Sequence, residues 1–132
     1  MDKLFNAVSI IIGIVGGAAA ALFGQWDNAL WALAAVMVMD YVTGIIKAAY
    51  QKTVSSEIGY KGILKKLTIL ITVALANVIQ TVTGASALRE IVIMFYIANE
   101  GISILENVAA VSENMPDALK NILFQLRNSE DE

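Results

Sequence analysis

The stretch Val36-Met-Val-Met-Asp-Tyr-Val-Thr-Gly-Ile-Ile-Lys-Ala-Ala-Tyr50 decides which fold this sequence predicts. Asp40 lies inside a run that is otherwise apolar on both sides, Gly44 follows about one helical turn later, and Lys47 comes three residues after that. The core of an ordinary soluble domain does not require such a pattern. The role of the carboxylate therefore depends on the solvent around it.

Composition indicates a lipid bilayer. Hydrophobic residues make up 58% of the 132 residues and charged residues 16%, against about 45–50% and about 25% in soluble domains. The formal net charge of −3 argues against nucleic-acid binding, which needs a basic face. The sequence has no Cys and no His, which excludes disulfides, thiolate metal sites and histidine acid–base chemistry. We expect no cofactor and no metal.

Four spans are predicted. Residues 4–23 contain no charged residue, and twenty apolar residues in a helix cross the roughly 30 Å hydrocarbon core. Further spans are expected at about 28–48, 66–83 and 90–111. With an amphipathic helix at about 116–127, the sequence predicts an all-α membrane protein with a single integral domain, residues 1–132.

The first span carries small residues four apart, which share one helical face and allow backbones to approach closely. They serve either packing within the chain or self-association, and they are Ser9, Gly13, Gly17 and Ala21. Gly44 is predicted to allow helix contact in the second span.

The later spans carry polar residues that a helix facing lipid would not keep. These residues are expected at helix contacts or along a pore, and they are Asp40, Thr43, Asn77, Gln80, Asn99, Glu100, Ser103, Glu106 and Asn107. An aspartate near mid-span costs roughly 2.5–3.5 kcal/mol on insertion scales, and no basic residue is expected at matching depth. The carboxylates are therefore protonated, or bonded across helices to Asn77, Gln80 or Ser103, or open to water.

Residues 50–62 are predicted to form a polar loop, with Ser55 or Ser56 as a possible helix N-cap. The basic residues around it suit a membrane entry, where long side chains reach the interface, and they are Lys47, Lys61, Lys65 and Lys66. Residues 85–89 are expected to form a short turn. At the C-terminal end, Leu119, Ile122, Leu123 and Leu126 recur at helical spacing, which suits a membrane surface or a partner protein.

With four spans, eight of the nine Lys and Arg residues lie on the side of the two termini, and only Arg89 lies on the other. The positive-inside rule then places both termini in the cytoplasm. A three-span version, with residues 91–111 on the membrane surface, would leave the C-terminus outside.

Catalysis is not expected, because no nucleophile has a base beside it. Three interpretations of the polar groups remain: a network that only holds the helices together, conduction of ions by one copy, or a water-lined path through several copies.

Several segments together resemble the bacteriophage holin family of the toxin-secretion and phage-lysis type. The similarity covers roughly residues 36–126, in the order Asp40-Tyr-Val-Thr-Gly44 with Lys47-Ala48, Ser55, Ser56, Gly59, Gly62, Lys65-Lys66, Tyr96-Ile-Ala-Asn-Glu100, Ser103-Ile-Leu-Glu-Asn107, Pro116 and Leu119.

This resemblance implies a protein of the bacterial cytoplasmic membrane that assembles with copies of itself into lesions. An endolysin, or in some relatives a large toxin, would then cross without binding the lesion protein directly, and a separate antiholin could regulate it. The alternatives are a membrane assembly subunit that docks a partner through residues 116–127, and a small transporter subunit.

Overall fold

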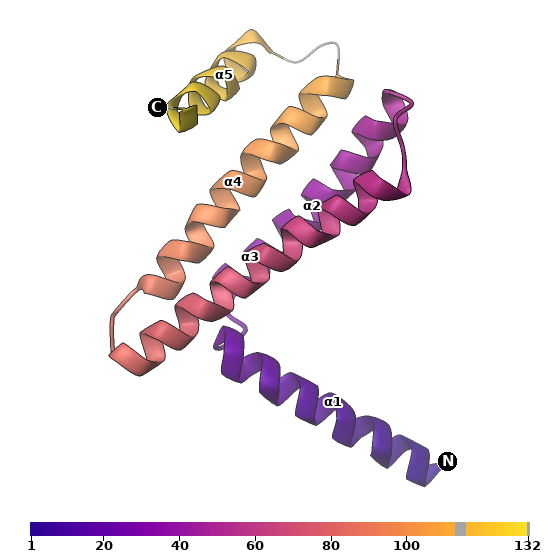
Figure 1. The fold of residues 1–132 in the computed structure, drawn as a ribbon, viewed down its shortest axis with the longest axis vertical. Coiled ribbons are helices and arrows are strands. Elements are labelled where there is room, and N and C mark those ends of the chain that lie inside the picture. Colours follow the sequence, from indigo (N-terminus) through magenta and orange to yellow (C-terminus); the bar gives the residue numbers. More distant parts are fainter. Residues whose placement is uncertain (113–115, 132) are drawn as a thin grey trace.

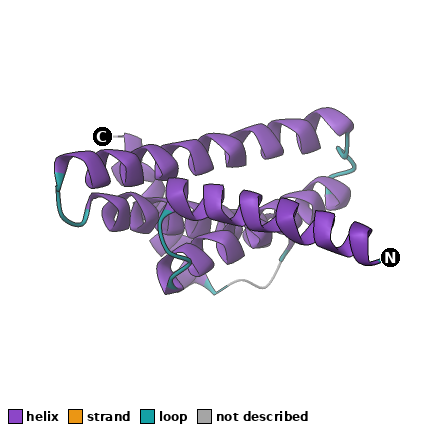
Figure 2. Ribbon diagram, turned by 90° about the horizontal axis from the view of Figure 1, so that it is seen from below, coloured by secondary structure: helices purple, strands orange, loops and turns teal. Residues whose placement is uncertain are grey.

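The computed structural model describes residues 1–112 and 116–131. Five helices follow one another in this part of the chain: α1 (Asp2–Phe23), α2 (Asn28–Tyr50), α3 (Ser56–Thr83), α4 (Leu88–Val111) and α5 (Asp117–Asp131). Helices α1 to α4 are long and apolar enough to cross a membrane. The prediction of an all-α membrane protein with four spans and a short C-terminal helix is confirmed. Figure 2 shows the short loops between the helices.

Two side-chain caps set the starts of α2 and α3. The Asp27 carboxylate accepts from the Leu30 amide at 2.9 Å, and the Ser55 hydroxyl accepts from the Ile58 amide at 3.2 Å. Each cap satisfies one of the amides that the first turn of a helix leaves unpaired.

The start of α3 corrects the predicted polar loop at residues 50–62. This segment is non-helical only up to Ser55, and α3 begins ten residues before the predicted third span. Hydropathy predicts only the apolar part of α3, from residue 66 onward. The helix begins earlier because Ser55 caps its first turn. Similarly, α4 begins at Leu88, so Arg89 lies in its first turn and not in the predicted loop.

Helices α2, α3 and α4 form the packed part of the molecule (Figure 1). Helix α2 packs most extensively on α4, and α3 contacts both. Their shared core consists of Leu30, Leu33, Met37, Ile69, Val73 and Ile93. Because α3 returns the chain between them, α2 and α4 run in the same direction.

Most apolar side chains of the bundle point outward. Ile71 and Ile91 are exposed, and Val82 is 80% exposed. A soluble domain would bury such residues, because each Val or Ile left in water loses roughly 1.5–3 kcal/mol of burial free energy. The arrangement therefore suits hydrocarbon as the surrounding solvent.

Helix α1 projects away from the other helices (Figure 1), and none of its residues is buried against the described part of the chain. Its C-terminal end contacts α3, where Asn77 Nδ2 donates to the carbonyls of Ala21 and Leu22. An added Cβ at Gly13 or Gly17 would meet no described atom within 4 Å. The small-residue face of α1 therefore has no intramolecular contact at these two positions.

Helix α5 packs against α4. Within the predicted apolar face of this helix, Leu119 is half-buried and Ile122 is exposed. The side chains of Leu123 and Leu126 lie outside the described residues.

Gly24 ends α1 with φ 81° and ψ −164°, a backbone region that is essentially restricted to glycine. An added Cβ would lie 2.9 Å from Asn77 Oδ1 and 3.0 Å from Arg89 Nε. Gly84 provides a milder comparison: its φ is also positive, at 71°, but its ψ of 8° places it in the left-handed helical region, and no described atom would lie within 4 Å of its added Cβ.

We predict that Gly24→Ala destabilises the protein more than Gly84→Ala. Backbone strain alone costs about 1–3 kcal/mol at such a position, and only Gly24→Ala also displaces Asn77 and Arg89. Unfolding midpoints of the two variants in detergent, followed by circular dichroism, measure the difference. Equal midpoints would contradict the tight contact at Gly24.

Candidate functional site

Three charged side chains from three helices meet inside the bundle. The Lys66 ammonium of α3 donates to Asp40 Oδ2 of α2 and to Glu100 Oε2 of α4. All three side chains are shielded, with relative exposures of 13% for Lys66, 9% for Asp40 and 0% for Glu100. We call Asp40, Lys66 and Glu100 the charge cluster.

The register of α2 and α4 brings the two carboxylates together. Asp40 is twelve residues after Asn28, the first residue of α2, and Glu100 is twelve residues after Leu88, the first of α4. Because the two helices run in the same direction, at about 1.5 Å per residue, the acids lie at similar depth. Two like charges so placed repel each other, and the cation from α3 compensates.

Asn107 of α4 supports the α2 side of the charge cluster. Its Nδ2 donates to Asp40 Oδ1 at 3.2 Å, to the Asp40 carbonyl at 3.3 Å and to Thr43 Oγ1 at 3.1 Å. An added Cβ on Gly44 would lie 3.7 Å from the same nitrogen, an ordinary contact distance. Gly44 therefore lies at the α2–α4 contact.

Lys66 corrects two expectations from the sequence. The sequence predicts Lys66 at the membrane entry and no basic residue at the depth of the intramembrane acids. The structure places the Lys66 ammonium against both Asp40 and Glu100. Asn77 and Gln80, expected as possible carboxylate partners, bond elsewhere: Asn77 Nδ2 donates to the Leu22 carbonyl at 2.9 Å, and Gln80 Oε1 accepts from the Arg89 amide at 2.9 Å.

The remaining predicted residues are half-buried or exposed. Asn99 and Ser103 are half-buried on α4, and Glu106 is exposed. Lys65 is exposed, Lys47 is half-buried, and Lys61 pairs with Glu57 at 3.0 Å on the surface. Ser9, Gly13, Gly17 and Ala21 are exposed on α1.

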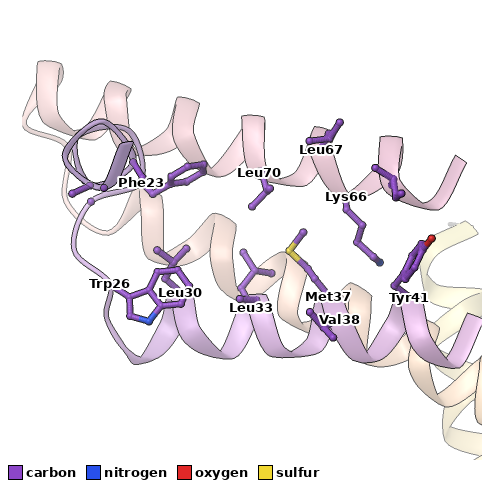
Figure 3. A pocket seen from close by; sticks show the side chains of 16 residues that line it. Phe23, Trp26, Leu30, Leu33, Met37, Val38, Tyr41, Lys66, Leu67 and Leu70 are labelled. Atoms are coloured by element: carbon purple, nitrogen blue, oxygen red, sulfur yellow. The ribbon is translucent and has the colours of Figure 1, made fainter. Parts of the chain in front are cut away.

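Lys66 and Tyr41 line two hollows that differ in size and in how many polar residues surround them. An almost entirely apolar groove of about 760 Å³ lies between the C-terminal part of α1, α2 and α3, and Figure 3 shows Lys66 reaching across from α3. A smaller hollow of about 170 Å³ lies beyond them, nearer the loop between α2 and α3, and its wall includes Asp40, Ser103 and Asn107. The Tyr41 ring fits beside Gly62, where an added Cβ would lie 3.2 Å from it.

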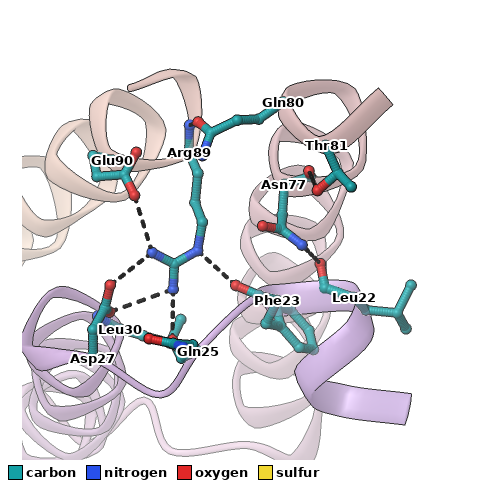
Figure 4. Close-up of polar contacts among 10 residues, drawn as sticks. All are labelled: Leu22, Phe23, Gln25, Asp27, Leu30, Asn77, Gln80, Thr81, Arg89 and Glu90. Atoms are coloured by element: carbon teal, nitrogen blue, oxygen red, sulfur yellow. Dashed lines mark hydrogen bonds and ion pairs between the residues drawn. The ribbon is translucent and has the colours of Figure 1, made fainter. Parts of the chain in front are cut away.

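A second polar cluster fixes the opposite end of the bundle (Figure 4). Arg89 is only 4% exposed. Its guanidinium donates to the Phe23 carbonyl at 2.6 Å, the Gln25 carbonyl at 3.0 Å, the Asp27 carboxylate at 2.8 Å and Glu90 Oε1 at 3.3 Å. We call this group the arginine clamp, because it ties the start of α4 to the turn between α1 and α2.

The clamp also acts on the charge of Asp27. The hydrogen bond from Arg89, followed by the backbone hydrogen bond from Leu30, lowers the pKa of the Asp27 carboxyl below its ordinary value. Sequence reasoning noticed Arg89 only as the single basic residue on its side of the membrane. Its partners Phe23, Gln25 and Asp27 lie 62 to 66 positions away in the chain, and nothing in the sequence points to that pairing.

The two clusters hold helices together through ion pairs and hydrogen bonds between charged side chains. The charge cluster joins three helices through one ammonium, so a change at any member alters the contact between all three. The arginine clamp fixes one end of α1 while the rest of α1 is free of the bundle.

We predict that Lys66→Met destabilises the bundle by about 3 kcal/mol or more, because removing one partner of a buried ion pair strands the other charges. Lys65→Met is the matched control: it removes the same charge one residue away, but Lys65 is exposed. Unfolding midpoints in detergent compare the two. If both variants unfold alike, Lys66 does not hold the cluster together.

We predict that Asp27→Asn loses a pH-dependent contribution to stability. Asparagine still caps a helix, so the change mainly removes the charge paired with Arg89, worth about 0.2–1 kcal/mol at this partly exposed position. The wild-type advantage is present above the ordinary aspartate pKa of about 3.9 and is lost as the pH falls through the lowered pKa. Unfolding of both proteins at pH 7 and pH 3 measures it. The advantage should be smaller at pH 3 than at pH 7, and an equal advantage at both pH values would contradict this assignment.

Comparison with known proteins identifies the family. The bacteriophage holin family matches residues 17–128. An uncharacterised protein of Listeria monocytogenes is 41% identical over 95% of this chain and 93% of its own, and one of Clostridium perfringens is 38% identical over 97% and 98%.

A protein of Bacillus phage phi105 named as a probable holin is 32% identical, over 87% of this chain and 85% of its own. No solved structure matches the chain. The family match extends from the C-terminal part of α1 through the charge cluster and the arginine clamp into α5, and it shows that this chain belongs to the bacteriophage holin family.

Proposed function

We propose that the protein assembles in the bacterial cytoplasmic membrane, with both termini in the cytoplasm, into lesions through which an endolysin or another large protein crosses. One observation carries this proposal: the chain belongs to the holin family, and its most apolar helix, α1, has no residue buried against the rest of the described chain. The distribution of Lys and Arg supports the orientation.

The face of α1 supports self-association. Glycine inside a helix is unfavourable by about 1 kcal/mol relative to alanine, yet Gly13 and Gly17 meet nothing in the described chain. Close helix packing is the usual use of small residues at four-residue spacing in membranes. A second copy provides a helix for this face.

The charge cluster supports a closed resting form. Asp40, Glu100 and Asn107 face the interior of one copy, so a single bundle offers lipid an apolar surface. Separation of α3 from α2 and α4 during assembly would bring these groups to water. The membrane potential acts on charge with about 2.3 kcal/mol per elementary charge per 100 mV. A loss of the membrane potential would therefore change the relative free energies of the closed and separated arrangements and favour the rearrangement.

The alternative is a membrane subunit that docks a partner through α5. The exposed Ile122 and Phe124 on this helix favour it. Such a subunit would not make the membrane permeable, so permeability distinguishes the two functions.

We predict that expression in bacteria with a cytoplasmic endolysin stops growth abruptly and lyses the cells, as followed by culture turbidity. The double variant Gly13→Ile, Gly17→Ile should delay lysis and reduce crosslinked oligomers, because the isoleucine side chains prevent a second helix from packing closely on the small-residue face. Ala18→Ile is the control, since Ala18 is also exposed on α1 but on another face. Normal growth with an intact membrane would reject lesion formation and favour the docking subunit.

A further inference from the structure

The two carboxyl groups of the charge cluster differ in their hydrogen bonds. Asp40 accepts a hydrogen bond on each oxygen, from Lys66 on Oδ2 and from Asn107 on Oδ1. An ionised carboxylate only accepts, so donors at both oxygens suit the charged form of Asp40.

Glu100 has a donor at one oxygen only. Lys66 donates to Oε2, whereas Oε1 is buried without a hydrogen-bond partner among the described residues. The side chain is 0% exposed. A buried anionic oxygen that lacks a donor loses its hydration without replacement, which is among the most unfavourable arrangements a polar atom can have.

The net charge of the cluster also favours one bound proton. The titratable groups around the cluster are Asp40 and Tyr41 from α2, Lys65 and Lys66 from α3, and Glu100 from α4. No ion pair between α5 and Glu100 occurs in the described residues. Lys65 is exposed, so one buried ammonium faces two carboxylates. Full ionisation leaves a net charge of −1 inside the bundle, and one bound proton brings the cluster to neutrality.

We propose that Glu100 is a proton-binding site, with the proton on Oε1 while Asp40 and Lys66 stay charged. The smaller hollow, which has Asp40 and Lys66 in its wall, provides the route. It ends on Lys66 and Asp40, and its volume of about 170 Å³ holds a few waters at about 30 Å³ each. The hollow lies toward the loop between α2 and α3. Protons therefore reach the cluster from the side of that loop.

Binding of this proton is coupled to helix packing. With the proton, the contact between α2, α3 and α4 is electrically neutral. Without it, a buried negative charge lies between α3 and α4 and favours their separation or the entry of water. The proton site lies within one copy of the protein and does not depend on lesion formation.

Infrared spectroscopy of the full-length protein in lipid bilayers at pH 7 tests the proposal. With ¹³C-labelled glutamate, a protonated carboxylic acid gives a C=O band that is separate from the bands of ionised carboxylates. We expect one such acid band in the wild type, and its absence overturns the proposal without the need for a variant.

Three variants assign the band. Glu100→Gln should abolish it, while Glu106→Gln, an exposed position on the same helix, should leave it unchanged. Asp40→Asn should also abolish it although Glu100 is retained, because Lys66 then faces a single carboxylate, which ionises. An acid band that survives either Glu100→Gln or Asp40→Asn would overturn the assignment.

Discussion

The ammonium of Lys66 between Asp40 and Glu100 is the interaction on which the bundle depends. Helices α2 and α4 run in the same direction and place two acids at the same depth, an arrangement that is repulsive by itself. The antiparallel α3 brings the one cation that contacts both. Among the residues whose burial is described, the apolar core between the helices has six buried side chains, so the charge cluster has a large influence on how α3 packs.

The arginine clamp divides the molecule into a fixed part and a projecting part. Arg89 and Asn77 bond the carbonyls of Leu22, Phe23 and Gln25, so the end of α1 and the following turn are bound firmly to α3 and α4. Gly24 allows the backbone to come this close. The rest of α1 contributes no buried residue. One helix is therefore presented to the bilayer from a rigid base.

The sequence predicted the four long apolar helices, because runs of apolar residues reveal them, but it placed the start of α3 ten residues too late. It also identified Asp40, Glu100 and Asn107 as residues that lipid would not accommodate. It failed at Lys66, because hydropathy treats a lysine near the polar end of a span as part of the interface. The position of Lys66 around the helix would have indicated its role, because Lys66 shares a face of α3 with Ile69, Val73 and Asn77, and these three residues are buried. The pairing itself joins residues 26 and 34 positions apart, which a single sequence does not reveal.

A buried ion cluster is a poor way to stabilise a bundle, since apolar residues of similar volume often do as well or better by about 1–4 kcal/mol. The charge cluster is therefore better explained by a second arrangement of the same helices. In the closed form Lys66 satisfies one oxygen of each acid, and in a form open to water all three groups regain hydration. Apolar residues would stabilise only the closed form. Under the proposed function, the charges keep the free energies of the two forms close enough for assembly to shift the equilibrium.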